Sequence, residues 1–169
     1  MSNSLLASCP VAIEHLDARL ADAATQRAFG GFAILLLDLD HFKIFSDEMG
    51  PGAANAALKI YSGRIDNALR DTDFFAKLGD DKYLVVVPQI SDVDTVTLVT
   101  NKLIETIARP ITVGGLEKQI TVSIGVSFFP EHGDDRQSLV SCAEQALATA
   151  KRHGRNRATI YSDSLRIAG

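Results

Sequence analysis

Two uninterrupted apolar runs constrain the fold of this chain more than any other feature of its sequence. The first extends from Phe32 to Leu37 and the second from Tyr83 to Val87. Runs of this length without polar alternation are typical of strands that are covered on both faces. The sequence therefore predicts a buried central sheet with helices packed against it.

Helical and β-type patterns alternate around these two runs. Amphipathic stripes predict helices over residues 11–28, 52–70, 92–109 and 138–152, with Ser91 or Asp92 as the cap of the third helix. Further strands are expected at residues 74–78, 111–113, 116–129 and 158–161, with tight turns at residues 79–81 and 114–115. A short polar and aromatic segment follows the first strand. The order predicts an α/β (α+β) fold of the split βαβ, ferredoxin-like kind, with an extra hairpin.

Composition narrows the class of protein further. The chain has 169 residues, 46% of them hydrophobic, which suits one globular domain. Its net charge of −4 gives no general attraction to DNA or to anionic membranes, and no run approaches the length of a membrane span. Cys9 and Cys142 are too far apart to indicate a zinc site, and the first ten residues do not resemble a signal peptide. A cytoplasmic location is therefore expected.

Acidic residues stand where the two apolar runs end or begin. Asp38 and Asp40 follow the first run, and Asp80, Asp81 and Lys82 precede the second. Carboxylates at a strand end and at a facing turn could supply oxygen ligands for Mg²⁺. The alternative is that each segment simply meets solvent, as strand ends and Gly-Asp turns commonly do. A lysine directly after the acids is unusual for a metal site, so the residues alone leave both interpretations open.

Taken together, these segments and two later ones resemble the four signatures of the GGDEF, or diguanylate cyclase, domain. The matching stretches are Asp38-Leu39-Asp40-His41-Phe42-Lys43, Gly79-Asp80-Asp81-Lys82-Tyr83, Thr121-Val122-Ser123-Ile124-Gly125-Val126, and Ala143 to Asn156. The resemblance covers nearly the whole chain and implies a palm-type nucleotidyl cyclase sheet. It divides the chain into a helical lead-in at residues 1–30, the GGDEF domain at residues 31–162, and a tail at residues 163–169.

The family's chemistry implies roles for several residues. Two GTP-loaded domains of the family join their substrates into cyclic di-GMP, with metal ions at the transferring phosphoryl group. By resemblance, Asp38, the carbonyl of Leu39 and Asp81 occupy metal positions. Lys151 and Arg155 occupy positions that hold the terminal phosphates. For these two cations, a basic last helical turn that complements the helix dipole is the alternative interpretation.

The sequence departs from the family pattern at several of these positions. Lys82 replaces a glutamate that the family needs for metal binding and catalysis, and Asp80 replaces a glycine. Ser46 and Asn55 stand where the family reads guanine with an asparagine and an aspartate, and Pro51 replaces a histidine. We therefore expect a remnant of a catalytic site, made of Asp38, Asp40, Asp80, Asp81 and Lys82, in which Lys82 reaches Asp38 or Asp81. Mg²⁺ is expected to bind weakly or not at all.

A second motif of the family is better preserved. Arg70 and Asp73 keep the spacing from Gly79 that the family's cyclic di-GMP inhibitory site requires. The two residues are three positions apart at the predicted end of a helix, so both side chains could face one ligand. The alternative is a helix-terminal arginine followed by turn aspartates, which needs no ligand. The sequence favours neither.

The preferred hypothesis is a catalytically inactive GGDEF-type domain that acts as a regulatory or nucleotide-sensing module in cyclic di-GMP signalling. The resemblance implies a larger protein, with an EAL-type phosphodiesterase or sensor domain as neighbour. GTP and cyclic di-GMP are the candidate ligands, and a homodimer is a candidate assembly. The alternatives are a weakly active cyclase that relies on Asp40 and Asp81, and a scaffold that binds proteins but no nucleotide.

Overall fold

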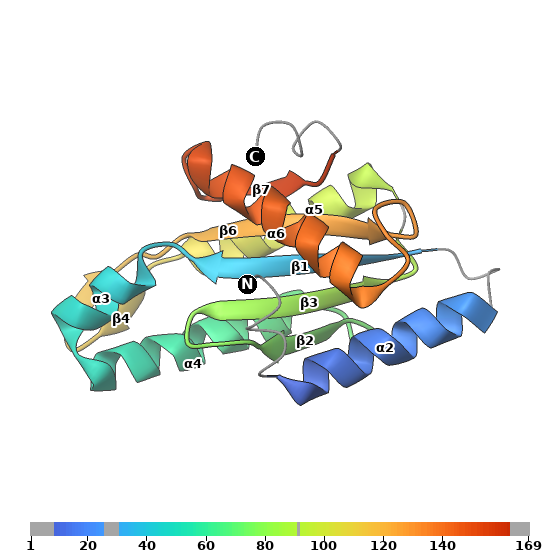
Figure 1. Cartoon of the computed structure of the whole chain (residues 1–169). Helices are drawn as coiled ribbons and strands as arrows, with labels where there is room; N and C mark the ends of the chain where they lie inside the picture. Colours follow the sequence, from blue (N-terminus) through green and yellow to red (C-terminus); the bar gives the residue numbers. More distant parts are fainter. Residues whose placement is uncertain (1–8, 26–30, 91, 163–169) are drawn as a thin grey trace.

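The computed structural model describes residues 9–25, 31–90 and 92–162 (Figure 1). The predicted tail at residues 163–169 and residues 1–8 and 26–30 of the lead-in therefore lie outside the described residues. The helices are α2 (Pro10–Thr25), α3 (Phe42–Met49), α4 (Pro51–Ala68), α5 (Val93–Ala108) and α6 (Arg136–Arg152). The strands are β1 (Phe32–Leu39), β2 (Phe74–Lys77), β3 (Lys82–Pro88), β4 (Ile111–Val113), β5 (Leu116–Lys118), β6 (Val122–Phe129) and β7 (Arg157–Ile160).

The two apolar runs form the middle of a five-stranded sheet with the order β2-β3-β1-β6-β7. Strand β1 pairs antiparallel with both β3 and β6, and all eight of its residues are buried. Strand β7 pairs with β6 in parallel. The predicted mixed α/β fold with a covered central sheet is confirmed.

Helices cover both faces of this sheet. On one face α4 and α5 supply Tyr61, Leu103 and Ile107 to a core with the odd-numbered residues of β1. On the other face α2 and α6 pack Leu16 and Leu139 against its even-numbered residues. In Figure 1, α6 crosses in front of β1 and β6. Because each face of β1 meets a helical layer, its side chains need no polar alternation.

One predicted strand is wrong. Residues 116–129 do not form a single strand, because the chain changes sheets between Lys118 and Val122. Strands β4 and β5 form a separate two-stranded hairpin, and β6 alone enters the main sheet. At the break, the Gln119 side chain donates a hydrogen bond to the carbonyl of Ala108 at 2.8 Å, which holds the connection against the end of α5. The hairpin turn itself is as expected, with Gly114 and Gly115 at φ 58° and 77°.

The polar and aromatic segment after β1 is a helix, α3. It buries Phe42 and Phe45, three residues apart and so on one face, in the core below the sheet end. His41 precedes it with a left-handed backbone, φ 57°, which turns the chain sharply away from the strand. This turn leaves the end of β1 open to one side. Among the described helices, none has the length and apolar character needed to cross a membrane.

Candidate functional site

A polar hollow of about 290 Å³ opens where β1 ends and β3 begins. Antiparallel pairing of the two strands sets Asp38 opposite Lys82, and the backbone N–H of Leu39 donates to the carbonyl of Asp81 at 3.0 Å. The last turn of α6 reaches the same place. The hollow thereby brings Lys82 together with the residues predicted for metal and phosphate binding: Asp38, Leu39, Asp81, Lys151 and Arg155.

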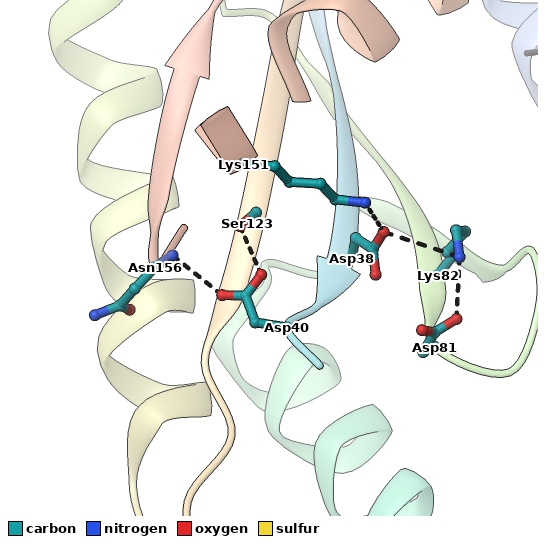
Figure 2. A network of polar contacts seen from close by, with 7 residues as sticks. All are labelled: Asp38, Asp40, Asp81, Lys82, Ser123, Lys151 and Asn156. Carbon is teal, nitrogen blue, oxygen red and sulfur yellow. Dashed lines mark hydrogen bonds and ion pairs between the residues drawn. The ribbon is translucent and has the colours of Figure 1, made fainter. Parts of the chain in front are cut away.

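Two lysines converge on Asp38 (Figure 2). The Lys151 ammonium donates a hydrogen bond to Asp38 Oδ2, and Lys82 Nζ lies 3.8 Å from the same oxygen. Lys82 Nζ also donates to Asp81 Oδ1 at 3.2 Å. The Asp38 side chain is only 7% exposed, whereas those of Lys82 and Lys151 are 36% and 35% exposed. A buried carboxylate thus meets two cations that still face solvent.

This arrangement of charges does not fit a divalent metal. The carboxylates of Asp38 and Asp81 are balanced by the ammonium groups of Lys82 and Lys151. A cation about 4 Å from an ammonium is repelled by roughly 4 kcal/mol per pair of unit charges at an effective dielectric constant near 20. Among the described residues, no group of three or more His, Cys, Asp or Glu side chains is placed to hold a metal ion. Mg²⁺ would therefore have to displace both lysines.

Asp40 points away from this cluster, although it is only two residues from Asp38 (Figure 2). Its carboxylate accepts hydrogen bonds from the hydroxyls of Thr121 and Ser123, both at 2.6 Å, and from the backbone N–H of Asn156 at 3.1 Å. Its own backbone N–H donates to the carbonyl of Thr121 at 2.8 Å. Asp40 therefore joins β1 to β6 and to the start of β7, and its oxygens do not face the hollow with Asp38.

The end of α6 and the turn that follows it contact both Asp38 and Asp40. After the helix, Gly154 adopts φ 116°, and the backbone N–H of Arg155 returns to the carbonyl of Ala150 at 3.0 Å. Such a closure satisfies a free helix carbonyl and reverses the chain. Arg155 and Asn156 then both have a left-handed backbone, with φ 64° and 51°. This places Arg155 at the hollow and the N–H of Asn156 on Asp40.

The predicted guanine-reading residues lie elsewhere. Ser46 is half-buried on α3 and Asn55 is exposed on α4, and neither lines the hollow at the end of β1. Asn55 instead borders a separate hollow of about 430 Å³, together with Lys59, Ser62 and Lys77. Pro51 is the first residue of α4, where the missing N–H of proline costs no hydrogen bond. Asp80 is exposed at the hairpin tip.

Arg70 and Asp73 contact each other. Helix α4 ends at Ala68, so both residues lie in the turn before β2 and not at the helix end as predicted. Asp73 accepts from the backbone N–H of Arg70 at 2.9 Å and from its guanidinium at 3.1 Å. The Asp73 side chain is 2% exposed, and that of Arg70 is 57% exposed. The arginine faces outward, while the carboxylate is already occupied.

Comparison with known proteins agrees with this geometry. The sequence profile of the family described as "Diguanylate cyclase, GGDEF domain" matches residues 10–157. The chain belongs to this family. Its signature hairpin is Gly79-Asp80-Asp81-Lys82-Tyr83, which puts Lys82 at the fourth position. Burial raises the pKa of Tyr83, and its hydroxyl hydrogen-bonds Ser62 at 3.1 Å, so the last signature residue anchors the hairpin in the core.

Relatives of this GGDEF domain include large signalling proteins of Pseudomonas aeruginosa. The chain is 34% identical to the cyclic di-GMP phosphodiesterase NbdA over 81% of its own length and 17% of NbdA. It is 33% identical to the bifunctional diguanylate cyclase/cyclic di-GMP phosphodiesterase MucR, over 89% of the chain and 22% of MucR. The chain thus spans about a fifth of these curated relatives.

A solved structure supports the same assignment. The GGDEF domain of PA1120 (TpbB or YfiN) from P. aeruginosa superposes with a TM-score of 0.88 at 26% identity, covering 95% of this chain and 92% of that one. The chain therefore has the fold of a solved GGDEF domain.

Sequence reasoning did not identify the partners of Asp40. Thr121, Ser123 and Asn156 lie within the third and fourth signatures, but they had no assigned role. The sequence did contain a signal for these contacts, namely two hydroxyl residues, Thr121 and Ser123, two positions apart in the segment that pairs with the end of β1. Residues two apart in a strand share a face, so these hydroxyls reach one carboxylate together.

Proposed function

We propose that this GGDEF domain does not synthesise cyclic di-GMP and acts as a regulatory, nucleotide-sensing module. The observation that carries the proposal is the Lys82 ammonium, which lies between Asp38 and Asp81 at the fourth position of the signature hairpin. The glutamate expected there would supply a negative ligand. Lysine removes that ligand and adds a repulsive charge.

Phosphoryl transfer depends on electrostatic stabilisation of the transferring group by correctly placed cations. In this domain the two carboxylates that would hold metal ions are already bound to side-chain ammonium groups. The altered guanine-reading residues, Ser46 and Asn55, add to the loss, because Asn55 offers one acceptor and a mismatched donor where the family uses a carboxylate. Each change alone weakens catalysis, and together they support a non-catalytic role.

The setting of the domain supports a regulatory role. The chain spans about a fifth of relatives whose names include cyclic di-GMP phosphodiesterase activity. We propose that it lies in a cytoplasmic part of a comparable multidomain protein, next to an EAL-type phosphodiesterase or a sensor domain. There it tunes its neighbour by binding GTP or cyclic di-GMP.

The decisive experiment is a cyclase assay with GTP and Mg²⁺ on the purified domain. We expect no cyclic di-GMP above a reaction without protein. In parallel, Lys82→Glu should gain affinity for Mg²⁺ or Mn²⁺ in a calorimetric titration, because it replaces a repulsive charge with a ligand. Clear turnover by the wild-type domain that Asp81→Ala abolishes would refute the proposal.

Cyclic di-GMP binding, if the domain senses this product, is proposed to depend on Arg70. Its guanidinium is mostly exposed and can fork onto a phosphate or guanine. Arg70→Ala should weaken binding by about tenfold to a hundredfold, whereas Arg109→Ala, an exposed arginine elsewhere, and Asp38→Ala should not. Asp73→Ala should reduce guanine selectivity, provided that the pair opens on binding.

Other outcomes of the same titration separate the remaining hypotheses. Binding that survives Arg70→Ala but is lost in Lys151→Ala or Arg155→Ala would place the ligand in the former substrate site. Absence of binding to both GTP and cyclic di-GMP would leave a scaffold that contacts only proteins.

A further inference from the structure

The hollow at the end of β1 carries a positive charge, which a metal site would not. Two carboxylates face it, Asp38 and Asp81, and four cations line it, Lys43, Lys82, Lys151 and Arg155. With a glutamate at position 82, three carboxylates would stand against three cations. One residue thus changes the net charge from 0 to +2, in a chain whose overall charge is −4.

We propose that this hollow binds the diphosphate group of a nucleotide or inorganic pyrophosphate without any divalent metal, and that Lys82 takes the place of the metal ion. The inference rests on the proposed non-catalytic, nucleotide-sensing function and specifies how its ligand is held. Asp38 and Asp81 then position the Lys82 ammonium, as they would otherwise position a metal.

The ammonium groups retain hydrogen-bond donors for such a ligand. Each ammonium carries three N–H groups. Lys82 uses one on Asp81 Oδ1, and Lys151 uses one on Asp38 Oδ2. About a third of each side chain is exposed, so the remaining donors have access to the hollow. Both ammoniums are held at one carboxylate oxygen, which keeps the two positive charges side by side before any ligand arrives.

The arrangement favours a compact polyanion over a single carboxylate. Two ammonium groups from β3 and α6 and the forked guanidinium of Arg155 border one hollow. Several phosphate oxygens can contact all three, and charge-assisted hydrogen bonds of this kind are the strong ones. The carboxylates of Asp38 and Asp81 remain in place and offset the repulsion between the two lysine ammonium groups.

Dependence on metal is the property that distinguishes this mode of binding. A phosphate site that uses Mg²⁺ loses affinity in EDTA. A site that uses tethered ammonium groups does not, and added Mg²⁺ lowers its affinity because the ion neutralises part of the ligand's charge. Isothermal titration of the wild-type domain with inorganic pyrophosphate and with GTP, each in EDTA and in Mg²⁺, measures this difference.

We expect the wild-type domain to bind both ligands in EDTA and to bind them no more tightly in Mg²⁺. Lys82→Glu should lose about tenfold to a hundredfold or more in EDTA, since a charged contact becomes repulsive, and should recover affinity only with Mg²⁺. Lys82→Gln should lose affinity in EDTA without recovery. Lys102→Glu makes the same charge change on the exposed surface of α5 and should behave as wild type.

Two results would overturn the inference. One is wild-type binding that is absent in EDTA, and the other is binding in EDTA that Lys82→Glu leaves unchanged. Thermal melts of each variant confirm that the fold is retained. Cyclic di-GMP synthesis by the wild type would overturn the proposed function instead, so the two failures are distinct.

Discussion

Asp38 and Asp40 are separated by one residue and are almost equally buried, with 5% and 6% of their surface exposed. Asp40 is held by two hydroxyls and a backbone N–H, all of them neutral donors. Asp38 is held by two lysine ammonium groups at the ends of long, partly exposed side chains. Similar burial therefore conceals two different kinds of environment.

The difference lies in what fixes the donors. The donors of Asp40 are positioned by the backbone of β6 and of the loop before β7, so they cannot follow a ligand. The donors of Asp38 move by side-chain rotation and lose little when they do. One aspartate therefore joins elements of the fold, whereas its neighbour faces a hollow and is held by side chains that can move.

The largest expected effect comes from removing the Asp40 carboxylate. Asp40→Ala should lower the free energy of unfolding by about 3–4 kcal/mol, because it leaves buried donors unpaired. Urea denaturation measures this loss. Asp40→Asn keeps one acceptor and should lose less. A loss below that of Asp38→Ala would reverse the comparison.

Removing one donor of Asp40 should have an intermediate effect. Ser123→Ala should lose about 1.5–3 kcal/mol of unfolding free energy, since its hydroxyl bonds an ionised group. Ser127→Ala is the matched control on the same strand. Its hydroxyl is equally buried but bonds the neutral carbonyl of Leu139, so about 0.5–1.5 kcal/mol is expected. Equal losses in the two variants would show that the charge of Asp40 adds nothing.

The Asp38 side should be much more tolerant. Asp38→Ala should change the free energy of unfolding by about 0–1 kcal/mol. The substitution removes the buried carboxylate, and the two lysine side chains that contacted it can then turn to solvent. The same urea titration measures it. A loss near that of Asp40→Ala would mean that the lysines are fixed parts of the fold.

Salt should have the smallest effect and should sharpen the contrast. Raising ionic strength from about 0.1 M to about 1 M shortens the Debye length from about 10 Å to about 3 Å. Any stability difference between the wild type and Asp38→Ala should shrink by a few tenths of a kcal/mol, about the scale of exposed pairs. The difference for Asp40→Ala should stay constant. Parallel denaturation series at the two salt concentrations test this.

Much of the fold followed from local pattern. The runs at residues 32–37 and 83–87 predicted the central strands, because an uninterrupted apolar run is typical of a strand that is buried on both faces. The N-cap of α5 is Asp92, one of the two candidates, and its carboxylate accepts from the N–H of Thr95 at 2.7 Å. A contact of Lys82 with Asp38 or Asp81 was also predicted, and the structure has Lys82 near both.

The missed features depend on where elements end. Asp38 and Asp40 would share a face if β1 continued, but the strand stops at Leu39 and the chain turns, so their side chains diverge. Arg70 and Asp73 would share a helical face if α4 continued, but it stops at Ala68. Element boundaries are the least certain part of sequence reasoning. Both errors concern residues within two or three positions of a boundary.

The strand order has a consequence for synthesis of the chain. Strand β1 lies between β3 and β6, and its pairing with β6 joins residues about ninety positions apart in sequence. On the ribosome, β3 can pair with β1, and β2 with β3, soon after residue 88 emerges, but the other edge of β1 remains unpaired until β6 follows. During that interval a strand that is apolar except for Asp38 has an open edge, which is the kind of surface that pairs with other chains. In the finished domain both edges of β1 are paired because the strand is central, but for the same reason its second edge stays unpaired for longest during synthesis.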